Sequence, residues 1–168
     1  MAIRRTVKFF AATATSANPT SEVSVAHVKI LFRYDGDTAG QYELESMWAL
    51  PHSDGYQLDN IPFYAREVAN GDVVTAQRGS DGELWYDKLV KPSGHSTIRL
   101  WFARPEDVQQ TRDELRALGC PSELSELPRL VAVDVPPNVP YSSVRAKLEQ
   151  GEREGLFEFE EACLGQAA

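Results

Sequence analysis

His95 is the residue of this chain whose chemistry could be used most directly. It lies in the run Gly94-His95-Ser96-Thr97. An imidazole titrates near neutral pH, so it can act as a general base or acid when a second group orients it. Asp59 or Asp87 would be the orienting carboxylate, although spacing alone places neither beside His95. The alternative is a buried histidine that bonds to the backbone, and the sequence leaves both interpretations open.

The segment 59–66 offers a second set of candidates. If it lines a pocket, its polar rim consists of Asn60, Tyr64 and Arg66. The Arg66 guanidinium would then clamp a carboxylate or a phosphate through paired hydrogen bonds. In the structural alternative, Ile61 and Phe63 close one end of a small barrel, and the polar residues bond only to nearby backbone.

Arg99 and Trp101 form a third set of candidates, because they share one face of the strand predicted for residues 97–103. Acidic residues such as Asp134 and Glu160 fall on the strands predicted beside it. An opposite charge on a neighbouring strand would pair with Arg99. This polar face is either open to a partner or packed against the N-terminal part of the chain.

The charge of the chain argues against nucleic acid as a partner. The 168 residues carry 17 basic and 25 acidic side chains, which gives a net charge of -8. Residues 101–168 hold 13 of the acids against 7 bases, so the surplus is concentrated in the C-terminal part. Such a surface repels phosphate backbones, whereas it would attract a basic protein. Solubility alone is a second explanation of the same surplus.

The sequence contains no motif that would hold a metal or a cofactor, and we expect neither. Cys120 and Cys163 form no C-x-x-C pair, and the histidines have no metal-ligand spacing. The glycine-rich phosphate loops, the G-x-S-x-G nucleophile motif and the H-E-x-x-H zinc motif are also absent. These absences exclude the common enzymes that carry such motifs, but not enzymes without a short signature.

The compartment predicted for this chain is the cytoplasm. Two cysteines do not make a disulfide framework, which is consistent with a reducing environment. The apolar runs are too short to span a bilayer, so we expect no membrane partner. Arg4-Arg5 and the stretch that follows loosely resemble an export signal, but Lys8 interrupts the apolar region. We therefore expect residues 1–22 to form a flexible tail that does not direct export.

The first part of the chain alternates between apolar and polar residues in short runs, which is typical of antiparallel strands. Strands are predicted at residues 25–34, 42–50, 56–58, 73–77 and 84–90. Asp-Gly turns separate several of these strands, for example Asp35-Gly36-Asp37. A meander or a small barrel is the expected arrangement.

The second part reads strand, helix, strand, strand, helix, strand. The predicted strands are residues 97–103, 122–127, 130–135 and the region of Phe157 and Phe159. The predicted helices begin near Pro105 and Tyr141. Their apolar stripes are Val108, Thr111, Leu115 and Leu118 in the first, and Tyr141, Val144 and Leu148 in the second.

These patterns predict an α+β fold in which an N-terminal antiparallel β-meander or small barrel precedes a ferredoxin-like βαββαβ unit. The expected domain bounds are 23–92 for the β domain and 93–165 for the α+β domain, with tails at 1–22 and 166–168. The two helical stripes should cover one face of the second sheet, which carries Val131, Val133 and Val135.

Five runs are distinctive: Asp59 to Arg66, Gly71-Asp72-Val73-Val74, Ser93 to Thr97, Ala132 to Pro137, and Gly151-Glu152 to Glu161-Ala162-Cys163-Leu164. Together they resemble an uncharacterised bacterial domain-of-unknown-function family, DUF4265. The similarity extends over about residues 26–164. It implies a stand-alone bacterial domain and brings no activity with it.

Two functions follow from these observations. The first is a small soluble binding or regulatory protein without catalytic activity, for instance one that neutralises a toxin, whose partner is a protein or a small ligand. The alternative is an enzyme with its site at the junction of the domains, around His95 and Arg66. Accessibility of His95, and its distance from a carboxylate and from Arg66, distinguish the two.

Overall fold

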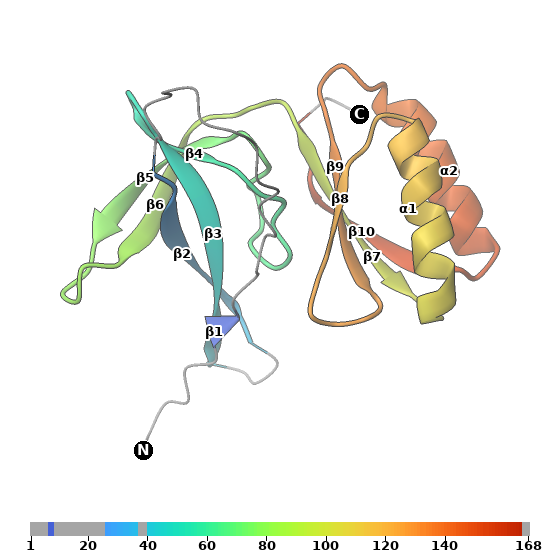
Figure 1. The fold of residues 1–168 in the computed structure, drawn as a ribbon, viewed down its shortest axis with the longest axis horizontal. Coiled ribbons are helices and arrows are strands. Elements are labelled where there is room, and N and C mark those ends of the chain that lie inside the picture. The colour runs from blue at the N-terminus through green and yellow to red at the C-terminus, as the bar shows by residue number, and fades with distance from the viewer. Residues whose placement is uncertain (1–6, 9–25, 37–39, 166–168) are drawn as a thin grey trace, which may run out of the picture.

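The computed structural model describes residues 7–8, 26–36 and 40–165, and in these residues the chain has a mixed α+β fold (Figure 1). Two sheets lie side by side, and two helices cover the second sheet on the side that faces away from the first. The tails expected at 1–22 and 166–168 fall outside the described residues, except for strand β1 (Val7–Lys8). This strand pairs in parallel with Leu44 and Glu45.

The first unit is built on strands β2 (Val28–Asp35), β3 (Tyr42–His52), β4 (Gly55–Leu58), β5 (Val73–Arg78) and β6 (Leu84–Lys91). Consecutive strands pair in antiparallel fashion, as predicted. In addition, β2 and β6 pair in parallel through Ile30 with Leu84 and Leu31 with Trp85. The pairings therefore form a closed circuit around an apolar core that includes Phe32, Met47, Leu58, Val68 and Val74.

The turn between β3 and β4 depends on a glycine. Gly55 has a φ of 144°, which side chains of L-residues rarely adopt. A Cβ atom at this position would lie 2.3 Å from the carbonyl oxygen of Val74. The close approach of β5 therefore requires a residue without a side chain. Ser53 and Asp54 form the turn that precedes Gly55.

The second unit contains strands β7 (Ser96–Phe102), β8 (Ser122–Leu124), β9 (Leu130–Val135) and β10 (Phe157–Cys163), in the antiparallel order β10-β7-β9-β8. A 3-10 turn, η1 (Pro105–Asp107), leads into helix α1 (Val108–Ala117), which connects β7 to β8. Helix α2 (Tyr141–Arg153) connects β9 to β10. The predicted order of elements along the chain is confirmed.

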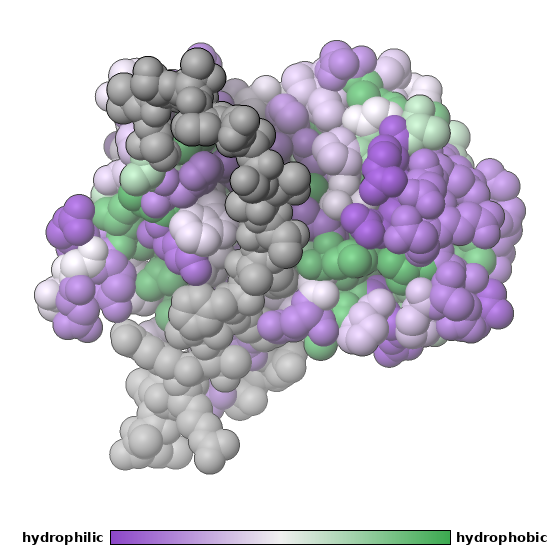
Figure 2. Space-filling view, in the orientation of Figure 1, coloured by the Kyte–Doolittle hydropathy of each residue, from purple (hydrophilic) through white to green (hydrophobic). Residues whose placement is uncertain are grey.

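The helices cover the valine-bearing face of this sheet, as the stripes predicted. Leu115, Leu148, Val131, Val133 and Val135 are fully buried in one apolar cluster. Burying each such side chain stabilises the fold by about 1.5–3 kcal/mol. Figure 2 shows that the outer surface of α1 and α2 is mainly hydrophilic, as expected for helices with one apolar stripe.

One member of the predicted stripe lies outside this core. Leu118 is 40% exposed, because α1 ends at Ala117 and Leu118 forms its C-cap. The backbone N–H of Leu118 bonds back to Leu115 while the side chain turns toward solvent. The prediction that Leu118 packs with Leu115 is therefore wrong.

The opposite face of the second sheet packs against the first unit. Leu130 and Ala132 of β9 form a small apolar cluster with Ile61 and Phe63, which come from the loop between β4 and β5. Ile61 and Phe63, which were expected to close the end of a barrel, therefore contact the second sheet. The alternative in which the polar face of the second sheet packs on the N-terminal part is confirmed for these residues.

Candidate functional site

A groove of about 650 Å³ lies at the junction of the two units. The first sheet and the loop between β4 and β5 supply Arg33, Tyr34, Asp35, Gly36, Glu43, Tyr64 and Arg66, and the second unit supplies Arg99, Trp101 and Leu127. Four of the candidates predicted from sequence, Tyr64, Arg66, Arg99 and Trp101, therefore meet in one hollow. We call this hollow the junction groove.

The loop that carries Tyr64 and Arg66 is held in place by a buried carboxylate. Glu45 of β3 accepts hydrogen bonds from the backbone N–H groups of Phe63 at 2.7 Å, Tyr64 at 3.0 Å and Ala65 at 2.7 Å. Burial raises the pKa of Glu45 above its ordinary value, while these donors and the charge of Arg99 lower it. Because three consecutive donors converge on one side chain, the loop conformation depends on Glu45.

Arg99 is the most deeply buried cation of the junction groove, with 8% of its surface exposed. Its Nη2 donates to the carbonyl oxygen of Ala65 at 2.5 Å, and its Nη1 donates to Glu160 at 3.2 Å. The predicted pairing of Arg99 with an acid on a neighbouring strand is confirmed for Glu160. The Nε of Arg99 has no hydrogen-bond partner among the described residues.

Glu160 also reaches Arg66, whose Nη2 lies 3.4 Å from the second carboxylate oxygen. One carboxylate thus bridges a buried and an exposed guanidinium, since the Arg66 side chain is 75% exposed and that of Arg99 is 9% exposed. Glu160 itself is 47% exposed and can leave this position for solvent at low cost. The two guanidiniums are therefore positioned to bind one anionic group together.

Aromatic side chains form the walls of the junction groove. Tyr34 stacks on Tyr64 with ring centroids 4.8 Å apart and an angle of 11° between the planes. The Tyr34 hydroxyl donates to Glu43 at 2.7 Å, and burial together with this carboxylate raises the pKa of Tyr34 far above its ordinary value. Trp101 is 40% exposed, and the Arg129 guanidinium carbon lies 5.0 Å from its ring centroid. The groove thus offers neutral, flat surfaces beside cations.

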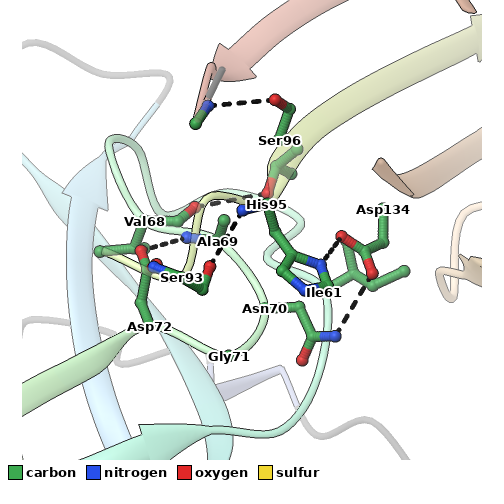
Figure 3. Close-up of polar contacts among 12 residues, drawn as sticks. Ile61, Val68, Ala69, Asn70, Gly71, Asp72, Ser93, His95, Ser96 and Asp134 are labelled. Atoms are coloured by element: carbon green, nitrogen blue, oxygen red, sulfur yellow. Dashed lines mark hydrogen bonds and ion pairs between the residues drawn. The ribbon is translucent and has the colours of Figure 1, made fainter. Parts of the chain in front are cut away.

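His95 lies in a different hollow from Arg66. Its Nδ1 is 2.7 Å from a carboxylate oxygen of Asp134, and the other oxygen of Asp134 accepts from Asn70 at 3.4 Å (Figure 3). The Asp134 side chain is 3% exposed and that of His95 is 23% exposed. A buried carboxylate therefore orients a partly accessible imidazole.

The hollow beside His95 has a volume of about 280 Å³ and is also lined by His52 and Lys91. The orienting groups suggested by sequence, Asp59 and Asp87, are engaged elsewhere. Asp59 pairs with His27 at 2.5 Å, and Asp87 accepts hydrogen bonds from Thr75 and Gln77, each at 3.0 Å. The expectation that either acid orients His95 is wrong, because strand pairing in the second sheet brings Asp134 to this position.

Asn60 does not line the junction groove and bonds to nearby backbone instead. Its Oδ1 accepts the backbone N–H of Trp48 at 2.8 Å, and its Nδ2 donates to the carbonyl oxygen of Ile61 at 3.4 Å. The residue is 9% exposed. Asn60 therefore ties the start of the loop to β3, while Tyr64 and Arg66 reach the groove.

Four residues of this site were not predicted from the sequence: Arg33, Tyr34 and Glu43 line the groove, and Glu45 anchors the loop that carries Tyr64 and Arg66. Alternation along residues 28–34 places Arg33 on the polar face of its strand, and this is the only sequence signal for it. No signal pointed to Glu45, because its position among apolar residues of β3 reads as an ordinary exposed acid. The groove wall depends on which strands meet at the junction, and alternation does not contain that information.

The cysteines take no part in either hollow. Burial and the charge of Asp134 raise the pKa of Cys120 to about 11, and burial raises the pKa of Cys163 as well. Within residues 7–8, 26–36 and 40–165, there is no group of three or more His, Cys, Asp or Glu side chains that could hold a metal ion. In the same residues, no helix is long and apolar enough to cross a membrane.

The fold and the groove define a two-unit α+β protein with a polar, aromatic hollow at the junction of its sheets. Residues 45–159 match the model of the family described as a domain of unknown function, DUF4265, and the chain belongs to this family. A crystal structure of a hypothetical protein from Neisseria gonorrhoeae is similar in fold, with a TM-score of 0.71 and 23% sequence identity. The alignment covers 84% of this chain and 98% of that protein. No curated protein matches the sequence.

Proposed function

We propose that this protein is a small binding or regulatory protein without catalytic activity, and that the junction groove recognises its target. The observation that carries the proposal is the convergence of Tyr64, Arg66, Arg99 and Trp101 on one hollow. Cations, flat aromatic surfaces and a hollow of this size are the usual parts of a recognition site. The target is a small ligand or a protein partner, and neutralisation of a toxin is one role of this kind.

The fold supports a more specific description of each unit. We propose that the second unit is ferredoxin-like, because its strand order β10-β7-β9-β8 and its helix-covered face fit the split βαβ arrangement. The closed circuit of pairings in the first unit supports a small barrel. The same architectures serve many functions, so the argument for binding rests on the groove.

The amino-acid composition supports two further parts of the proposal. A net charge of -8 disfavours binding to nucleic acid, and the scarcity of cysteine favours the cytoplasm. A basic partner would meet the acidic C-terminal part first. The arginines of the junction groove are an exception to this overall charge, which makes the groove distinct from the rest of the surface.

The test is native mass spectrometry of the protein purified gently from its own cells. We expect wild type to retain a bound molecule or partner that Arg66→Glu and Trp101→Ala both lose. Lys88→Glu is the matched control, because it makes the same charge change at an exposed position of β6 outside the groove. Wild-type protein that is always monomeric and free of any bound molecule would overturn the proposal.

A second candidate is an enzyme at the junction, and the contact between His95 and Asp134 favours it. A buried carboxylate on Nδ1 fixes the tautomer that leaves Nε2 able to take a proton. Arg66 lines a different hollow, so Lys91 would have to supply the positive charge beside His95. An enzyme at His95 requires a catalytic activity that His95→Ala abolishes and Arg66→Glu leaves intact. The groove proposal predicts instead that Arg66→Glu abolishes binding and that His95→Ala leaves binding intact.

A further inference from the structure

We propose that the junction groove binds a small molecule in which a carboxylate or a phosphate is attached to a planar ring. This inference rests on the function proposed above and specifies its ligand. The volume of about 650 Å³ falls in the range of small-molecule pockets. A protein partner would need a contact surface several times larger than the mouth of such a hollow.

The anionic end of the ligand is assigned to the side of the groove where the β4–β5 loop meets the second sheet. There Arg66 of the loop and Arg99 of β7 already share one carboxylate, that of Glu160. A carboxylate or phosphate of the ligand would take the place of Glu160, which is half-exposed and can turn into solvent. Guanidinium groups form their strongest hydrogen bonds with such oxyanions, because both the charge and the planar fork match.

Arg99 makes the replacement of Glu160 specific for an anionic group of the ligand. Its guanidinium is held by the Ala65 carbonyl and cannot follow Glu160 outward. Its Nε is buried and has no hydrogen-bond partner among the described residues, so one donor of the group is still to be used. A cation fixed in this way, with an unused donor, is prepared for an anion that arrives from the groove.

The planar part of the ligand is assigned to the aromatic walls. Trp101 lines the groove and is 40% exposed, while the stacked pair of Tyr34 and Tyr64 forms another part of the lining. Aromatic rings attract one another in stacked or edge-on contacts beyond the effect of burial alone. On the side of the first sheet, the carboxylates of Asp35 and Glu43 outnumber the single guanidinium of Arg33, so this side disfavours an anion. The orientation of the ligand is therefore fixed.

The experiment uses phenyl phosphate and benzoate as probes, and inorganic phosphate and benzyl alcohol as their anionic and neutral halves. Binding is followed by the fluorescence of the tryptophans and by isothermal titration calorimetry. We expect each aryl anion to bind about tenfold more tightly than either half, a factor that corresponds to about 1.4 kcal/mol. Trp101→Ala should remove the advantage of phenyl phosphate over inorganic phosphate.

The variant Glu160→Gln gives the sharpest result, because it removes the internal competitor of the ligand. We expect it to bind phenyl phosphate several times more tightly than wild type. Glu158→Gln is the matched control: it removes the same charge from the same face of β10, whereas the ion pairs with Arg66 and Arg99 are made by Glu160. Equal affinities of wild type and Glu160→Gln, or equal binding of benzyl alcohol and phenyl phosphate, would overturn the assignment of an aryl anion.

Failure of this inference can be distinguished from failure of the proposed function. If the aryl anions do not bind but native mass spectrometry still detects a molecule lost in Arg66→Glu, the groove is a recognition site for a different ligand. If neither experiment detects binding, both proposals are wrong.

Discussion

The two faces of the second sheet have opposite characters. One face carries Val131, Val133 and Val135, and the helices cover it completely with apolar side chains. The other face carries Leu130, Ala132, Arg99 and Trp101, and the first unit covers it only in part. Where the cover is complete, the residues serve stability alone. Where it is incomplete, a buried cation and an exposed aromatic remain at a groove, and there we expect recognition.

Within the junction, charge is buried in two ways. In the junction, Glu45 is satisfied by three backbone donors and Asp134 by His95 and Asn70. Arg99 retains one unused donor. Buried polar groups are normally fully paired, so the Nε of Arg99 is an informative atom of the junction.

The largest effect is expected on the helix-covered face. Leu148→Ala should lower the free energy of unfolding by about 2–5 kcal/mol, because it leaves a cavity in a core that is fully buried. Urea denaturation measures this change. Leu118→Ala, in the same unit but 40% exposed, should change stability by less than about 0.5 kcal/mol. Similar losses in both variants would contradict the contrast between a covered and an exposed leucine.

A smaller effect is expected at the base of the junction. Glu45→Gln should cost about 1–3 kcal/mol, because an amide cannot accept from three consecutive N–H groups as a carboxylate does. The variant should also bind phenyl phosphate more weakly, since the loop that carries Tyr64 and Arg66 loses its anchor. Glu158→Gln serves as the control in the same urea titrations. A Glu45→Gln protein as stable as wild type would show that the loop is held by other contacts.

The core beneath α1 also predicts a pH effect at Cys120. Its pKa of about 11 exceeds the ordinary value of 9.0, so the folded state holds the thiol proton more tightly than the unfolded state. Its contribution to stability is therefore present below pH 9.0 and is lost as the pH rises through about 11. Stability measured from pH 8 to pH 11 should fall less in Cys120→Ala than in wild type. Rapid alkylation of Cys120 at pH 8 in the folded protein would contradict its burial.

The smallest effect on stability is expected in the groove itself. Arg66→Ala removes a side chain that is 75% exposed, and its ion pair with Glu160 should contribute less than about 1 kcal/mol. Thermal unfolding should therefore be almost unchanged, while binding of phenyl phosphate is lost. A stability loss as large as that of Glu45→Gln would mean that Arg66 serves the fold.

The sequence predicted the helix-covered face well because periodicity reports it directly. Leu115 and Leu148 recur at helical spacing, and the valines of β9 alternate, so both sides of that core were predictable. The junction was not predictable in this way, because the sequence allows Ile61 and Phe63 to pack against either unit. Their contacts with Leu130 and Ala132 are visible only in the three-dimensional structure. Candidates with distinctive chemistry, such as Arg66 and Arg99, were found individually. Their meeting at Glu160 depends on the register of β7 and β10.

The measurement that tests the central claim most directly is a titration of labelled protein with phenyl phosphate, followed by nuclear magnetic resonance. The signals to observe are the Nε–H of Arg99 and the indole N–H of Trp101, which line the junction groove, and the indole N–H of Trp85, which does not. We predict that the first two shift together and saturate, while the signal of Trp85 stays in place. Shifts centred on His95 and Lys91, or no saturable shift at Arg99, would contradict the account.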